Sequence, residues 1–154
     1  MEELNPSIRI IIAWFAGALA IVVFREPVLE FLHVVHLTVR TGYSTVPTAP
    51  MAVPQVASDM FWAAVWAMGL AFLTVKRPTG ATMFRNSIIY GAVALSIVQW
   101  VFIAMAKQLP LFDGGHPGEI ITTLLSNGAW GFGTALFLLV FSFATVKLSP
   151  LSLT

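Results

Sequence analysis

Four long apolar runs limit the fold of this chain more than any other feature of its sequence. Only two charged residues, Arg9 and Asp59, occur within the runs, and each lies near an end. About 20 helical residues cross a lipid hydrocarbon core that is about 30 Å thick. We therefore predict one all-α integral membrane domain over residues 1–154, with four transmembrane helices at 8–24, 57–75, 87–106 and 120–146.

The composition agrees with this assignment and excludes several classes of function. Charged residues make up 10% of the chain, against about 25% in soluble globular proteins, so little polar surface remains for a soluble domain. The chain has no cysteine, which excludes disulfides and thiolate metal sites. Phosphate-binding glycine loops, nucleophile elbows and zinc-protease motifs are all missing from the sequence. We therefore expect a non-enzymatic protein with no cofactor and no nucleic-acid partner.

The distribution of positive charge predicts the orientation in the membrane. If the N-terminus is cytoplasmic, the short loop 76–85 is also cytoplasmic, and it contains three positively charged residues. Short cytoplasmic loops carry such an excess of Lys and Arg. The longer loops 25–56 and 108–119 then lie outside. The pattern predicts that both termini are cytoplasmic.

A motif that occurs twice divides the chain into two halves. The pattern Ser-Asp-x-x-Trp-Ala at 58–63 returns as Ser-Asn-x-x-Trp-Gly at 126–131, and both runs end in Thr-Val-Lys. A fainter match relates the first run to the third and aligns Arg9 with Arg85. Each half crosses the membrane twice, so both halves have the same orientation. We therefore predict two tandem helical hairpins that form a parallel repeat.

Small residues recur four positions apart along the predicted helices. Residues with this spacing lie on one helical face, and in lipid such stripes usually mark the contacts between helices. We predict helix packing through these positions, and the alternative is a substrate groove that they line. The residues are Ala63, Ala67 and Ala71, Gly131 and Ala135, and Ala13 and Gly17.

Three polar residues in the spans are candidates for a ligand, ion or proton site. Asp59 and Asn127 occupy equivalent positions in the two motifs, and Gln99 lies near the middle of the third run. Ionisable residues within a membrane are often functional. Asp59 could instead cap its helix, and Asn127 could form a hydrogen bond across helices to Asp59 or its surroundings.

The outer segment 25–56 predicts a short helix outside the bilayer core. Pro27 occupies a favoured first position of a helix, and one side of the following stretch is apolar, which suits a helix in the membrane interface. His33 and His36 lie on this stretch and His116 lies in the other outer loop. They are weak candidates for a metal site, which needs three or four converging ligands, and we predict no bound metal.

Four residues are predicted to fix the helices at the membrane surfaces. Trp62 and Trp130 fall near the outer ends of their helices, where aromatic side chains are enriched. Arg9 and Arg85 are expected to extend their charged ends toward the inner headgroups.

The stretches Asn-Gly-Ala-Trp-Gly at 127–131 and Phe-Trp-Ala-Ala-Val-Trp-Ala at 61–67 carry a resemblance to a known group. The chain resembles small four-helix bacterial inner-membrane proteins that have no assigned activity. The resemblance supports the membrane class and the topology, and we expect the chain in the bacterial inner membrane.

Two hypotheses for the function remain. The first is a non-catalytic accessory or scaffold subunit of a membrane complex, or a homo-oligomeric bundle, whose partners are the lipid bilayer and other membrane subunits or itself. The second is a small transporter or channel with a polar site between the repeats, near Asp59 and Asn127.

Overall fold

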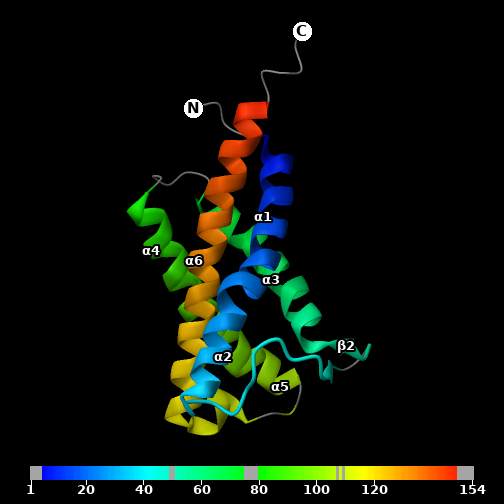
Figure 1. Cartoon of the computed structure of the whole chain (residues 1–154), viewed down its shortest axis with the longest axis vertical. Helices are drawn as coiled ribbons and strands as arrows, with labels where there is room; N and C mark the ends of the chain where they lie inside the picture. Colours follow the sequence, from blue (N-terminus) through cyan, green and yellow to red (C-terminus); the bar gives the residue numbers. More distant parts are fainter. Residues whose placement is uncertain (1–4, 49–50, 75–79, 107, 109, 149–154) are drawn as a thin grey trace.

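The computed structural model describes residues 5–48, 51–74, 80–106, 108 and 110–148, and these residues form a helical bundle (Figure 1). Four of its helices are long and apolar enough to cross a membrane. The prediction of an all-α fold with four such helices is confirmed. One small addition is an antiparallel pair of two-residue strands, β1 (Pro47–Thr48) and β2 (Val53–Pro54).

The first long helix consists of α1 (Pro6–Ala20), the π-helical segment η1 (Ile21–Arg25) and α2 (Glu26–Val34). Asn5 caps its start, because the Asn5 side chain accepts a hydrogen bond of 2.9 Å from the Ser7 amide. We predicted a span that ends at residue 24 and a separate outer helix. That boundary is wrong, since helical backbone angles continue through Arg25 and Glu26.

The continuity depends on how the backbone accommodates Pro27. In η1 the Glu26 amide donates to the Ile21 carbonyl, five residues back. The next donor in this pattern would be Pro27, which has no N–H. The hydroxyl of Tyr43 donates to the Val22 carbonyl instead, at 2.8 Å. A side chain from a later segment thus replaces the missing backbone donor, and the helix continues past the proline.

The other three long helices have simpler boundaries. The second is α3 (Gln55–Thr74). The third combines α4 (Ala81–Ile89), the π-helical segments η2 (Tyr90–Leu95) and η3 (Val98–Ile103), and α5 (Ala104–Ala106). After the short turn η4 (Leu111–Gly115), the fourth helix is α6 (Pro117–Leu148). Residues 76–79 of the predicted basic inner loop lie outside the described residues, and the prediction of a loop is wrong for residues 81–85, which form the first part of α4.

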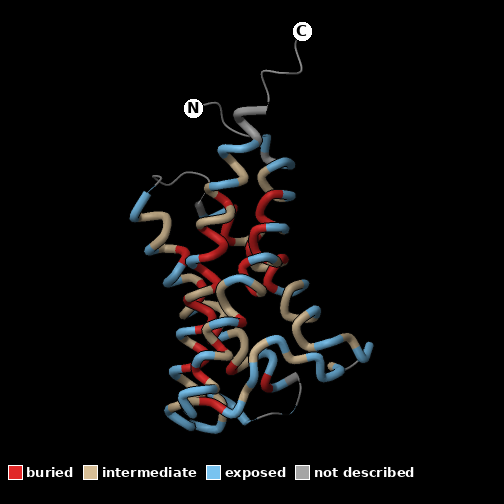
Figure 2. Tube along the Cα trace, viewed as in Figure 1, coloured by how far each residue is buried: buried red, intermediate tan, exposed pale blue. Residues whose placement is uncertain are grey.

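The helices pack in the order α3, α1, α6 and then α4 with η2. At Gly17 of α1, an added methyl group would collide with Ala67 of α3, and at Gly131 of α6 it would collide with the Ser87 carbonyl of α4. The small residues predicted to mark helix packing are all buried, as the buried segments in Figure 2 illustrate. Helix backbones therefore approach closely wherever side chains are small.

Trp130 lies in the centre of the bundle. Only 1% of its surface is exposed, and its indole nitrogen donates a hydrogen bond of 3.0 Å to the Gly17 carbonyl on α1. The prediction that Trp130 anchors the chain at an interface is therefore wrong. By contrast, 56% of the surface of Trp62 on α3 is exposed.

The two ends of the bundle differ in character. At one end α1 begins and α6 ends (Figure 1). At the other, which we call the loop end, α2 ends, α6 begins and the connections before α3 and before α6 lie (Figure 1). Every acidic residue that the structure describes lies at or near the loop end: Glu26, Glu30, Asp59, Asp113 and Glu119.

Candidate functional site

Glu119 is the centre of a polar network at the loop end. It lies in the first turn of α6, where a negative charge is favoured by the helix dipole. Its carboxylate accepts hydrogen bonds from the Thr38 hydroxyl at 2.7 and 2.8 Å, the Val39 amide at 2.9 Å and the Arg40 Nε at 2.8 Å. All three donors belong to the segment that follows α2, so one carboxylate holds that segment against the start of α6.

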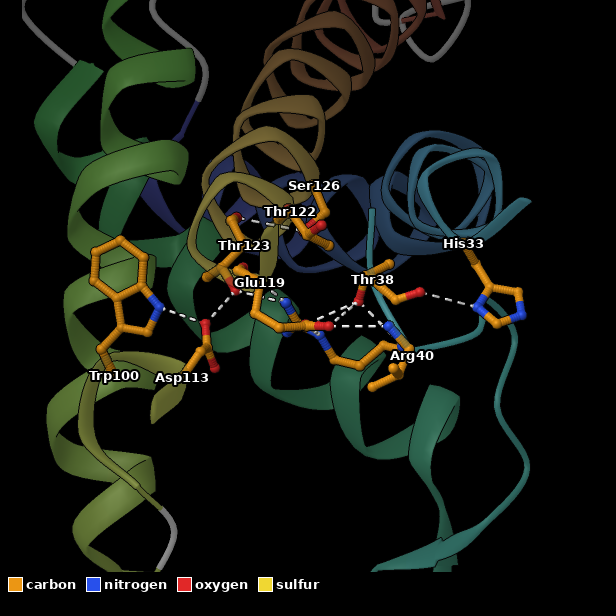
Figure 3. Close-up of polar contacts among 10 residues, drawn as sticks. His33, Thr38, Arg40, Trp100, Asp113, Glu119, Thr122, Thr123 and Ser126 are labelled. Atoms are coloured by element: carbon orange, nitrogen blue, oxygen red, sulfur yellow. Dashed lines mark hydrogen bonds and ion pairs between the residues drawn. The ribbon is translucent and has the colours of Figure 1, made fainter. Parts of the chain in front are cut away.

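The network continues from Arg40 to the opposite side of the bundle (Figure 3). The Arg40 guanidinium donates to the Glu119 carbonyl at 3.1 Å and to the Thr123 hydroxyl at 2.8 Å. Thr123 in turn donates to Asp113 at 2.8 Å, and the Trp100 indole donates to the same Asp113 oxygen at 2.7 Å. Both connections at the loop end are therefore joined to the third and fourth long helices through side chains.

A second cluster forms where the first long helix meets the start of α3. Arg25 forms an ion pair with Asp59 at 3.0 Å and with Glu26. Gln55 donates to the other oxygen of Asp59 at 2.7 Å. Glu26 is 2% exposed and also accepts a hydrogen bond of 2.6 Å from the Tyr43 amide. Because this buried carboxylate has two charge-assisted or backbone donors, its desolvation is compensated.

The three predicted polar site residues have separate surroundings. Asp59 binds Arg25 and Gln55, whereas the buried Asn127 amide donates to the Ser96 hydroxyl on the third long helix at 3.1 Å. The expected bond from Asn127 across helices is present, but its acceptor is Ser96. Gln99 is half-buried, and the described residues give its side chain no hydrogen bond.

The predicted histidines do not converge. His33 Nδ1 lies 3.2 Å from the Thr38 carbonyl, while His36 and His116 are exposed. No group of three His, Cys, Asp or Glu side chains within the described ranges could hold a metal ion. The histidine that contributes to the site does so by contacting the backbone of the segment held by Glu119.

Apart from Asp59, sequence reasoning did not single out the residues that form the two clusters, among them Arg25, Glu26, Thr38, Arg40, Asp113, Glu119 and Trp100. One available signal was the concentration of opposite charges in the two outer loops. Another was Glu119 directly after a Pro-Gly pair, a pattern that places a carboxylate in the first turn of a helix.

The arrangement is suited to fixing segments relative to one another. Carboxylates accept hydrogen bonds from backbone amides, hydroxyls and guanidinium groups that come from distant parts of the chain. Comparisons with protein-family models, curated proteins and solved structures found no match.

Proposed function

We propose that this chain is a non-catalytic membrane bundle that serves as an accessory or scaffold subunit of a membrane complex, or that forms a homo-oligomer. We place it in the bacterial inner membrane with both termini in the cytoplasm. The observation that carries the proposal is that four buried polar side chains within the long helices, those of Asn127, Trp130, Ser126 and Thr134, bond to neighbouring helices or to their own backbone.

Four hydrogen bonds illustrate this use of polar groups. Asn127 bonds to Ser96 and Trp130 bonds to the Gly17 carbonyl, each across a helix contact. Ser126 and Thr134 donate to carbonyls one turn earlier in α6, at 2.7 and 2.9 Å. Two further buried hydroxyls, on Ser87 and Thr122, have no partner among the described residues. Polar groups that hold helices together favour a scaffold over a conduction path.

The outer surface of the bundle supports contact with lipid or with other membrane helices. Large apolar side chains with more than half of their surface exposed occur on all four long helices. Examples are Phe15, Phe72, Phe102 and Phe143. In water such a surface would cause aggregation, whereas a bilayer or a neighbouring subunit would cover it.

Two features support the proposal of tandem hairpins with parallel orientation. Asp59 and Asn127, which are equivalent in the sequence motif, each bond to the preceding long helix, to Arg25 and Ser96 respectively. The π-helical segments also follow the repeat, since η1 lies in the first long helix and η2 and η3 lie in the third. The second and fourth long helices are α-helical throughout their described lengths.

Purification of the tagged chain in mild detergent, followed by native mass spectrometry, tests the scaffold proposal. We expect a stoichiometric complex with other membrane proteins, or a homo-oligomer of fixed size. A chain that remains a monomer under conditions that preserve known membrane complexes would contradict the proposal.

The partly buried ion pair between Arg25 and Asp59 favours a second candidate, a small transporter or channel. In proteoliposomes loaded with an ion- or pH-sensitive dye, this candidate predicts a flux that Asp59→Asn abolishes. Trp62→Phe, on the exposed side of the same helix, is the matched control and should leave the flux unchanged. If the native protein conducts no faster than empty liposomes, the transporter candidate is wrong.

A further inference from the structure

We propose that residues 38–43 form a strap that three glutamates hold closed against the loop end, and that protonation of Glu119 opens it. The strap connects the end of the first long helix to the segment before α3. This conformational device is separate from the scaffold role, because it concerns the motion of one segment within a single chain.

Each part of the strap is held by a carboxylate from a long helix. Glu119 of α6 binds the first part through the Thr38 hydroxyl, the Val39 amide and Arg40. Glu30 of α2 accepts a hydrogen bond of 2.9 Å from the Gly42 amide, and Glu26 accepts one of 2.6 Å from the Tyr43 amide. Three backbone amides of one short segment therefore depend on three ionisable acceptors.

The closed position requires close contact at Gly42. A methyl group added there would lie 2.6 Å from the Glu26 carbonyl oxygen and 3.0 Å from the Glu30 Cβ. The strap therefore lies directly on the surface of α2, next to the buried Glu26. Because the Tyr43 amide is one of the partners of Glu26, opening the strap would remove a hydrogen bond from a carboxylate that is also paired with Arg25.

Protonation weakens this arrangement because hydrogen bonds to an ionised acceptor are roughly twice as strong as bonds to a neutral one. Acid also removes the attraction between Glu119 and Arg40. The strap should therefore be closed while the Glu119 carboxylate is ionised and should open when it becomes protonated.

Other charged groups around the glutamates modify the response. Glu26 faces Arg25, which also binds Asp59, and Glu119 lies next to Arg40, which is connected through Thr123 to Asp113. His33 Nδ1 lies 3.2 Å from the Thr38 carbonyl and adds a contact to the same segment that does not involve the glutamates.

Hydrogen–deuterium exchange of the full chain in lipid nanodiscs tests the proposal. Exchange of a peptide that covers residues 38–43 is measured at about pH 7.5 and at about pH 3, which lies well below the ordinary glutamate pKa of about 4.3, and is corrected for the intrinsic rate at each pH. We expect protection of the strap to fall about tenfold or more in acid, as for the loss of one or more charge-assisted hydrogen bonds. Protection in the middle of α6 should not change.

Three variants distinguish opening of the strap from general unfolding of the chain. Glu119→Gln mimics protonation and should lower strap protection at neutral pH. Gly42→Ala should lower it at both pH values, because the collision with α2 does not depend on charge. Gly128→Ala is the matched control for the glycine variant: the nearest atom to a methyl group there is the Ala92 Cβ at 3.5 Å, an ordinary contact within the bundle, so strap protection should remain as in the native chain.

Two results would overturn the proposal. One is strap protection in the native chain that does not change with pH. The other is a folded Glu119→Gln chain whose strap is as protected as that of the native chain at neutral pH. If Glu119→Gln fails to fold, the pH dependence of strap protection in the native chain and the effect of Gly42→Ala on that protection still test the proposal.

Discussion

At the scale of single residues, Trp130 shows how a side chain can have a different role from the one its position suggests. Its repeat partner Trp62 is exposed, as a residue at a membrane surface would be, whereas Trp130 is buried and bonded to Gly17. The bond supplies the indole N–H with an acceptor where water cannot reach. Loss of such a bond leaves a buried carbonyl with fewer donors.

This difference predicts unequal effects of the same substitution. Trp130→Phe removes the indole donor and part of the buried ring, and should lower the free energy of unfolding by about 2–4 kcal/mol. Trp62→Phe should change it by less than about 0.5 kcal/mol. Denaturation in mixed micelles, monitored by the circular dichroism of the helices, measures the free energy of unfolding of both variants. Equal losses for the two variants would contradict the buried role of Trp130.

At the scale of helices, Gly131 and Gly128 of α6 form a natural comparison. A methyl group at Gly131 would collide with the backbone of Ser87, whereas at Gly128 the nearest atom is the Ala92 Cβ at 3.5 Å, an ordinary contact. We expect Gly131→Ala to lower the free energy of unfolding by at least about 2 kcal/mol. Gly128→Ala should be neutral or slightly stabilising, because Ala favours helix more than Gly does. Similar stabilities in the same denaturation assay would show that α4 and α6 do not pack as described.

The helix that contains Pro27 gives a second prediction at this scale. Tyr43→Phe removes the donor to the Val22 carbonyl and should cost about 1 kcal/mol of stability. In a Pro27→Ala background the new backbone N–H can donate within the helix, so the same Tyr43→Phe change should cost less. A double-mutant cycle measures the difference. Equal costs in both backgrounds would mean that the tyrosine does not replace the missing proline donor.

The existence of the long helices could be predicted from the sequence, but the extent of the first one could not. Apolar runs with almost no charge predict long helices directly, and small residues four positions apart predict the faces at which these helices pack closely. Pro27 was interpreted as a helix start because its N–H is not needed there. The donor that lets the helix continue comes from Tyr43, and no local pattern connects that residue with Val22.

The network around Glu119 was not predictable for a related reason. Its partners Thr38 and Arg40 lie about 80 positions earlier in the chain, and none of these residues belongs to a recognisable motif. Their proximity is a result of the packing of α2 and α6. Asp59 and Asn127 were identified because the sequence motif occurs twice. A repeated motif predicts that the two residues occupy equivalent positions, but it does not predict that Arg25 and Ser96 are their partners.

At the scale of the whole molecule, the proposed orientation places the two ends of the bundle in different compartments. Because the chain has no cysteine, a single introduced cysteine can be labelled without background. An impermeant maleimide should label His116→Cys in intact cells, and Ala81→Cys only after the inner membrane is opened. Both positions are exposed. Labelling of both from the same side would contradict four crossings with this orientation.

The contacts between α1 and α6, together with the bonds from residues 38–40 to Glu119, all join the first half of the chain to the second. A chain divided between Thr74 and Ala81 would keep every one of these contacts. Two separately expressed fragments should therefore find each other in the bilayer and copurify, and Glu119→Ala should weaken their association. In that case the two halves would recognise each other through their folded surfaces, and the peptide segment that joins them would not be needed for their association.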